Sequence, residues 1–121
     1  MLINIMTPIW KTLNVSSTEV GIYPKYEVSV YGEVRTKKNQ RPVKIFTHKD
    51  TGYKTITISR DSVLKTYTVH RIVATSHITN PDCYAEVDHI NGNKSDNTVR
   101  NLRWCSHQQN MKFYRDRIQN A

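Results

Sequence analysis

The sequence predicts a small α+β protein with a β-rich first half and a mixed second half. The chain has 121 residues, which suits a compact structure with a modest hydrophobic core. Residues 26–69 alternate repeatedly between apolar and polar side chains, as half-buried antiparallel strands do. The last third has the pattern of strand, loop, strand and helix. We therefore expect a small antiparallel β module over residues 8–68 and a second unit, ending in a helix, over residues 69–118.

Four alternating runs define the expected β module. The run YEVSVYGEVRT is interrupted at Tyr31-Gly32, which predicts a hairpin turn. VKIFTH and YKTITIS flank KDTG, a turn with Gly52 at the left-handed position, and VLKTYTV follows the next turn. Together these runs predict one small antiparallel sheet over residues 26–69, whereas residues 1–20 show no clear pattern.

Two helices and two short strands are expected in the second half. Val69, Ile72 and Val73 follow helical spacing, so we expect a helix that begins near Thr68 and ends before the tripeptide NPD. AEVDH and NLRWC predict strands on either side of the polar loop INGNKSDNTV. Trp104 and Trp10 are expected to anchor the core.

A capping box marks the start of the last helix. Ser106 offers the N-cap hydroxyl and Gln109 stands three residues later, so the helix is expected over residues 107–118. Its apolar stripe is expected to consist of Met111, Tyr114 and Ile118.

The overall charge favours an anionic partner. The chain has 18 lysine and arginine residues against 10 aspartate and glutamate residues, a net charge of +8. Such a balance suits nucleic acid or an acidic membrane surface. No apolar run is long enough to span a membrane, and the start of the chain lacks the basic region and cleavage site of a signal peptide. Cys83 and Cys105 form no CxxC motif and are expected to be buried free thiols.

Asp88, His89 and Asn110 form the candidate site. A helix packed across the hairpin would bring its first turns over the hairpin end, so that Asp88 and Asn110 supply two oxygen ligands, as Mg²⁺ prefers. A neutral imidazole at His89 can take a proton from water. Because neighbouring side chains on a strand point to opposite faces, we expect the strand to break at His89. This combination predicts hydrolysis of a phosphodiester bond.

These residues resemble the HNH endonucleases with the ββα-metal fold, in particular the phage-type homing endonucleases. The resemblance rests on VHRIVA, VDHINGNKSDN, NLRW and an asparagine six positions after Trp104. It implies that Asp88 and Asn110 bind one Mg²⁺ or Mn²⁺ ion and that His89 is the general base. Asn101, the middle letter of the motif, is implied to hold the loop that positions His89. Asn110 stands where many members carry a histidine, and His107 is the alternative residue for that position.

The first half resembles the nuclease-associated modular motif that precedes this core in such enzymes. Trp10-Lys11 and YEVSVYGEVR carry this second resemblance. It implies a β-rich DNA-binding module over residues 8–68, followed by the HNH core over residues 69–118. The basic side chains expected to contact DNA are Arg35, Lys37, Lys38, Arg41, Lys44, Arg71, Lys94, Arg103, Lys112 and Arg115.

The resemblance implies a DNA endonuclease that leaves 5′-phosphate and 3′-hydroxyl ends. The single active site in the chain predicts a monomer that nicks double-stranded DNA. The resemblance also implies a phage or another mobile element as the source, with action in the cytoplasm of a bacterial host and without a membrane partner. One alternative is a DNA-binding protein that keeps the HNH scaffold without catalysis. A further alternative is a nuclease directed at RNA.

Overall fold

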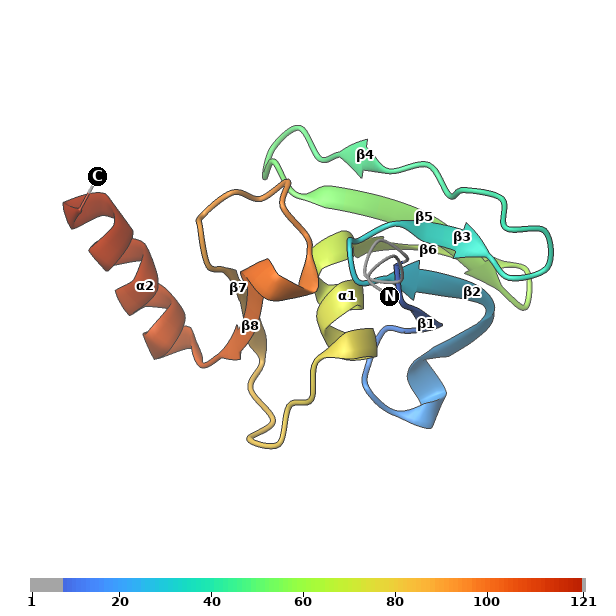
Figure 1. Ribbon diagram of the computed structural model, residues 1–121, viewed down its shortest axis with the longest axis horizontal. Helices are drawn as coiled ribbons and strands as arrows, with labels where there is room; N and C mark the ends of the chain where they lie inside the picture. The colour runs from blue at the N-terminus through green and yellow to red at the C-terminus, as the bar shows by residue number, and fades with distance from the viewer. Residues whose placement is uncertain (1–7, 121) are drawn as a thin grey trace, which may run out of the picture.

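The structure, a computed structural model, describes residues 8–120. These residues form two three-stranded antiparallel sheets, a two-stranded hairpin and two α-helices (Figure 1), which confirms the predicted α+β class. Neither of these helices is long and apolar enough to cross a membrane. Residues 1–7 lie outside the described part, so the expectation that the chain has no signal peptide stays a prediction.

The first sheet has the strand order β1 (Trp10–Asn14), β2 (Ile22–Ser29) and β3 (Val34–Thr36). A short 3-10 helix, η2 (Glu19–Gly21), joins β1 to β2. The hairpin predicted at Tyr31-Gly32 connects β2 to β3, and Gly32 has a φ of 83° there. β1 lies in a segment without a predicted element, because its regularity comes from pairing with β2 across a register shift.

The second sheet consists of β4 (Phe46–Thr47), β5 (Lys54–Arg60) and β6 (Val63–Thr68). The strands predicted over residues 26–69 thus divide between two sheets instead of forming one. The strand predicted at VKIFTH is only two residues long, and both of its side chains are exposed. Alternation in β5 is as expected, because Ile56 and Ile58 are buried while Thr57 faces outward.

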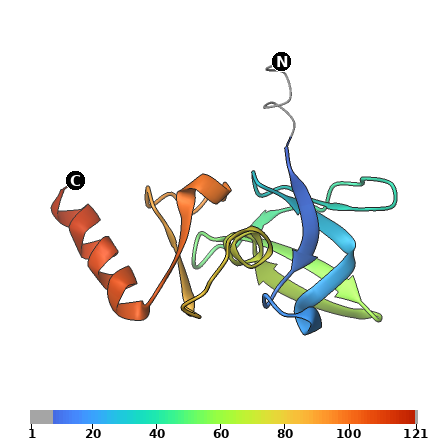
Figure 2. The same cartoon turned by 60° about the horizontal axis from the view of Figure 1, so that its bottom comes forward.

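Helix α1 (Val69–His77) lies at the centre of the molecule, between the sheets and the C-terminal hairpin (Figure 2). It begins directly after Thr68, as predicted, and its apolar face joins one hydrophobic core with residues of both halves. The side chain of His77 at its end bonds to the carbonyl oxygen of Val28 at 2.8 Å. The core is therefore continuous across residue 68, and the division into modules 8–68 and 69–118 stays a prediction.

The C-terminal hairpin pairs β7 (Glu86–His89) with β8 (Leu102–Cys105), and the 3-10 helix η3 (Val99–Asn101) precedes β8. Helix α2 (His107–Gln119) extends from the hairpin away from the rest of the molecule (Figure 1). The predicted capping box is present, with Ser106 and Gln109 each accepting from the other's backbone amide.

The predicted apolar stripe of α2, Met111, Tyr114 and Ile118, is about half exposed, and polar side chains join the helix to the hairpin. Two expectations about burial are wrong. Cys105 is buried but Cys83 is exposed, since it lies in the turn after α1. Trp104 is half-buried against the core as expected, whereas Trp10 lies outside the core cluster beneath the guanidinium of Arg35.

Candidate active site

Strand β7 carries the side chains of the candidate site. Asp88 pairs with Arg103 and His89 pairs with Leu102 across the hairpin. The strand ends at His89 but keeps its register up to that residue, so the expected break lies one position later. Successive side chains therefore have different neighbours: Asp88 contacts arginines, and His89 contacts aromatic rings and an amide.

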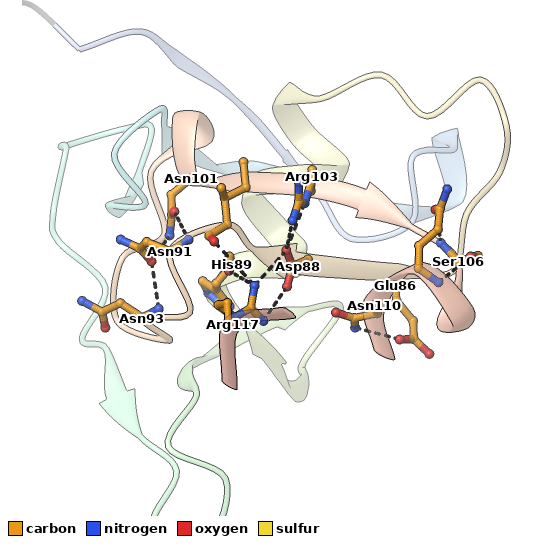
Figure 3. A network of polar contacts seen from close by, with 12 residues as sticks. Glu86, Asp88, His89, Asn91, Asn93, Asn101, Arg103, Ser106, Asn110 and Arg117 are labelled. Atoms are coloured by element: carbon orange, nitrogen blue, oxygen red, sulfur yellow. Dashed lines mark hydrogen bonds and ion pairs between the residues drawn. The ribbon is translucent and has the colours of Figure 1, made fainter. Parts of the chain in front are cut away.

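Asp88 is 3% exposed and forms ion pairs with two arginines. Nη2 of Arg103 on β8 lies 3.0 Å from Oδ2, and Nη2 of Arg117 on α2 lies 3.1 Å from Oδ1. Arg117 also donates to the carbonyl oxygen of His89 at 3.3 Å (Figure 3). Two guanidinium groups thus offset the cost of burying the carboxylate, and Arg117 fastens α2 to β7.

Asn110 is the fourth residue of α2, at the end of its first turn, and is bound to Glu86 at the start of β7. Its Nδ2 donates to Oε1 of Glu86 at 2.9 Å, while Oε2 of Glu86 lies 2.9 Å from Nδ1 of His107. The hydrogen bond from Asn110 and then that from His107 lower the pKa of Glu86 below its ordinary value. Glu86 therefore remains a carboxylate and orients the Asn110 amide.

The ring of His89 is 6% exposed and packs among other rings. Its centroid lies 4.8 Å from that of His70 and 6.1 Å from that of Tyr53, and Tyr53 stacks on His70 at 4.8 Å. Nε2 of His89 lies 2.7 Å from Oδ1 of Asn97. Burial, together with the nearby His89 and Arg71, lowers the pKa of His70 to about 3, so His70 is neutral at physiological pH.

Asn101 binds both sides of the loop that follows β7. Its Oδ1 accepts from the backbone amide of Asn91 at 3.0 Å, and its Nδ2 donates to Oδ1 of Asn91 and to the carbonyl of Asp96, both at 2.9 Å. Its own carbonyl accepts from the amide of Ile90 at 2.8 Å. The residue therefore closes the loop just beyond His89, although it does not touch the imidazole.

A cleft of about 490 Å³ lies between β7 and α2. Asp88, His89 and Asn110 all line it, together with Glu86 and Arg117. Within the described residues no hydrogen bond joins Asp88 to Asn110, because each is bound to a different partner. The cleft nevertheless combines a buried carboxylate, an imidazole, an amide and a guanidinium over one open space.

Two family models match the chain. Residues 67–112 match the HNH endonuclease model, and residues 9–59 match the NUMOD4 motif. Residues 67–112 thus belong to the HNH endonuclease family. Asp88, His89, Asn101 and Asn110 all lie within the HNH match. The predicted family is thereby confirmed, and the NUMOD4 match covers the β-rich half.

Known HNH endonucleases resemble most of this chain. DNA endonuclease I-HmuI of Bacillus phage SP01 is 37% identical over 92 residues, 76% of this chain and 52% of that protein. An uncharacterised HNH endonuclease of Acanthamoeba polyphaga mimivirus is 38% identical over 86 residues, 71% of this chain and 26% of that protein. A solved structure of DNA binding and cleavage by the HNH homing endonuclease I-HmuI matches with a TM-score of 0.72 and 33% identity, covering 90% of this chain and 59% of that one. The chain thus spans about half the length of I-HmuI.

The HNH cleft has few ligands for a metal ion. Among the described residues, no group of three or more His, Cys, Asp or Glu side chains is arranged to hold one. One buried carboxylate at Asp88 and one amide oxygen at Asn110 fit a hard divalent cation that retains most of its water. Both oxygens of the Asp88 carboxylate are paired with guanidinium groups, so a metal ion bound there would share the carboxylate with Arg103 and Arg117 or displace one of them.

The side chains predicted to contact DNA fall into two groups. One group has intramolecular partners and comprises Arg35, Lys37, Arg71, Lys94, Arg103 and Lys112. In the described structure the other group has no hydrogen bond or ion pair from its side chains and comprises Lys38, Arg41, Lys44 and Arg115. Side chains of the second group are more available to phosphates, because those of the first group are already held by other residues. Arg35, for example, lies between Glu27 at 2.7 Å and the Trp10 ring at 3.6 Å. All ten assignments stay predictions.

Four residues of this HNH site were not selected from the sequence. Glu86 binds Asn110, and Asn97 binds His89. Arg117 forms an ion pair with Asp88. Tyr53 stacks on His70, beside His89. Period-two alternation in AEVDH places Glu86 on the face of Asp88, so that residue had a detectable signal. Arg117 and Tyr53 reach the site from distant positions in the chain, which no local pattern indicates. Asn97 is only eight residues from His89, in the loop that follows β7, but its contact with the imidazole depends on how that loop folds.

Proposed function

We propose that the protein is a metal-dependent DNA endonuclease that hydrolyses phosphodiester bonds and nicks double-stranded DNA. The observation that carries this proposal is the shared cleft, which Asp88, His89 and Asn110 all line in an HNH family member. The related I-HmuI is described as a DNA endonuclease, which supports DNA as the substrate class. A monomer in the cytoplasm of a bacterial host, encoded by a phage or another mobile element, remains part of this proposal.

His89 is proposed as the general base. Oδ1 of Asn97 accepts a hydrogen bond from Nε2, so Nδ1 of His89 is the nitrogen that can take a proton from water. The resulting hydroxide forms a bond to phosphorus as the bond to the 3′ oxygen breaks. The products are a 5′-phosphate and a 3′-hydroxyl, whose proton comes from solvent.

Asp88 and Asn110 are proposed to hold one Mg²⁺ or Mn²⁺ ion through a carboxylate and an amide oxygen. When bound, such an ion stabilises the negative charge that develops on the phosphoryl group and the leaving oxygen. Arg117 and Arg103 place two guanidinium groups beside the same carboxylate, where they can bind the oxygens of an incoming phosphate. The N-terminal end of α2 adds a favourable field for that anion through the helix dipole.

Nicking of supercoiled plasmid with Mg²⁺ or Mn²⁺ tests the proposal. The wild-type chain should convert supercoiled plasmid to open circles, and His89→Ala should reduce the rate by roughly a hundredfold or more. The endonuclease proposal would be rejected if His89→Ala still nicked plasmid, or if the wild-type protein were inactive with every divalent ion. A DNA-binding protein without catalytic activity would then be the remaining interpretation. A panel with RNA substrates separates DNA from RNA as the target.

A further inference from the structure

The side chain of Asn97 makes a short contact to the proposed general base. Nε2 of His89 lies 2.7 Å from Oδ1 of Asn97, and both residues are buried, at 6% exposure each. An amide oxygen only accepts hydrogen bonds, so Nε2 must carry a proton and donate it. In a neutral imidazole this leaves the lone pair on Nδ1. The contact therefore determines which nitrogen of His89 can act as a base.

Asn97 is in turn packed against the N-terminal half of the chain. A Cβ atom built on Gly32, in the β2–β3 turn, would lie 3.0 Å from the carbonyl oxygen of Asn97 and 3.1 Å from its Cβ. The backbone amide of Val99 donates to the carbonyl of Val30 at 2.8 Å, which attaches the same loop to the same turn. The loop that carries Asn97 thus rests on the first sheet.

The β2–β3 turn is itself held in one conformation. Oγ of the fully buried Ser29 accepts from the backbone amides of Tyr31 and Glu33, both at 3.1 Å. The carbonyl of Ser29 also accepts from the amide of Gly32 at 3.1 Å. These bonds give the turn a fixed surface against which Asn97 is placed.

We propose that Asn97 is a positioning residue, which holds His89 as the Nε2–H tautomer, and that the β2–β3 turn of the N-terminal half holds Asn97. The proposal rests on the proposed function, in which Nδ1 of His89 takes a proton from water. It gives the NUMOD4 half a role in the chemical step in addition to any contact with DNA.

Nitrogen NMR of the histidine rings in the full, DNA-free chain tests the first part directly. Long-range ¹H–¹⁵N spectra distinguish the two neutral tautomers, and the His89 signals are those absent from His89→Ala. The wild type should show Nε2 protonated and Nδ1 unprotonated. Asn97→Asp retains an acceptor oxygen and should keep this tautomer, whereas Asn97→Ala should lose it.

Plasmid nicking adds the kinetic consequence. Asn97→Ala should lower kcat by roughly ten- to a hundredfold with KM for DNA unchanged, and Asn97→Asp should restore most of the rate. Gly32→Ala pushes on Asn97 and should lower kcat in the same way. Gly52→Ala is the matched control, because Gly52 has a similar φ of 78° but its Cβ would meet only Cδ of Lys94, at 3.6 Å.

An Nδ1–H tautomer in the wild type overturns the proposal, as does an unchanged tautomer in Asn97→Ala. Equal losses of kcat in Gly32→Ala and Gly52→Ala overturn the part assigned to the turn. If wild-type protein nicks no DNA, the proposed function fails, while the NMR measurement still decides whether Asn97 sets the tautomer. If Asn97→Ala does not fold, the His89 tautomer in the wild type and the kcat of Gly32→Ala decide whether the proposal holds.

Discussion

The side-chain amide of Asn110 donates a hydrogen bond to the carboxylate of Glu86 at 2.9 Å. Because the nitrogen and the oxygen of an amide lie on opposite sides of its carbon, this contact turns Oδ1 of Asn110 away from Glu86. Glu86 shares the strand face of Asp88 and also binds His107. The proposed second metal ligand is therefore oriented by a neighbour that the motif does not include.

Glu86→Ala is expected to weaken divalent-ion binding. Removing the acceptor frees the Asn110 amide to rotate, and losing such a supporting residue reduces metal affinity by roughly tenfold or more. Electron paramagnetic resonance of Mn²⁺ titrated into DNA-free protein measures this directly. Glu86→Gln keeps an acceptor oxygen and serves as the control; equal affinity in wild type and Glu86→Ala would show that Glu86 does not support the ligand.

His70 should make folding stability depend on pH. Its pKa is lowered to about 3 in the folded protein, so below the ordinary value of 6.5 the unfolded chain binds the proton more readily. This contribution to stability is fully present above pH 6.5 and is lost as pH falls toward 3. Between pH 7 and pH 5 the free energy of unfolding should fall by about 2 kcal/mol from this group.

Urea unfolding of wild type and His70→Phe at both pH values measures this contribution. Phenylalanine keeps a ring against Tyr53 but cannot be protonated, so the dependence should become shallower. His77, whose pKa is also lowered by burial, adds to the slope in both proteins and therefore cancels in the comparison. Identical pH slopes in the two proteins would contradict the prediction.

Arg117→Gln is expected to loosen helix α2. No residue of α2 is buried, so the contacts of Arg117 to Asp88 and to the carbonyls of His89 and Ile90 hold much of the helix in place. Losing a charge-assisted contact of this kind costs about 1–2 kcal/mol locally after allowance for solvent. Hydrogen exchange should accelerate in α2 but not in α1. Arg115→Gln, an exposed change on the same helix, should leave the rates unaltered.

Lys38 and Arg41 should contribute to DNA affinity mainly through charge. Both are exposed and, in the described structure, their side chains have no hydrogen bond or ion pair. Each phosphate contact that is lost should reduce the slope of log K against log salt by roughly 0.9. Fluorescence anisotropy with duplex DNA at several salt concentrations measures the slope for Lys38→Gln and Arg41→Gln. Lys25→Gln, outside the predicted set, is the comparison, and an equal effect there would remove the specific assignment.

Local patterns predicted the parts of the site whose structure is determined locally. The capping box of Ser106 and Gln109 fixed the start of α2, and alternation around Asp88 fixed β7. The exposed stripe of α2 was not predictable, because helical spacing shows that a helix has an apolar side but not whether a partner covers it. Arg117 and Asp88 are 29 residues apart, so their pairing depends on the angle between α2 and the hairpin.

β1 illustrates the same limit in the first half. The strand consists of five residues and forms along β2 with a register shift, so its conformation depends on a partner rather than on its own composition. The contact between Asn97 and His89 likewise requires the loop after β7 to rest on the β2–β3 turn. Such tertiary contacts place the supporting residues, whereas the motif places the reacting ones.

The continuous core limits how the two halves can be exchanged during evolution. Val69 and Ile72 of α1 belong to the same buried cluster as Leu13, Val28 and Ile56 of the two sheets. A recombination event that joined this HNH half to an unrelated N-terminal partner would leave α1 facing mismatched side chains. Hybrid proteins would be viable only when the surfaces facing α1 had been inherited together with it.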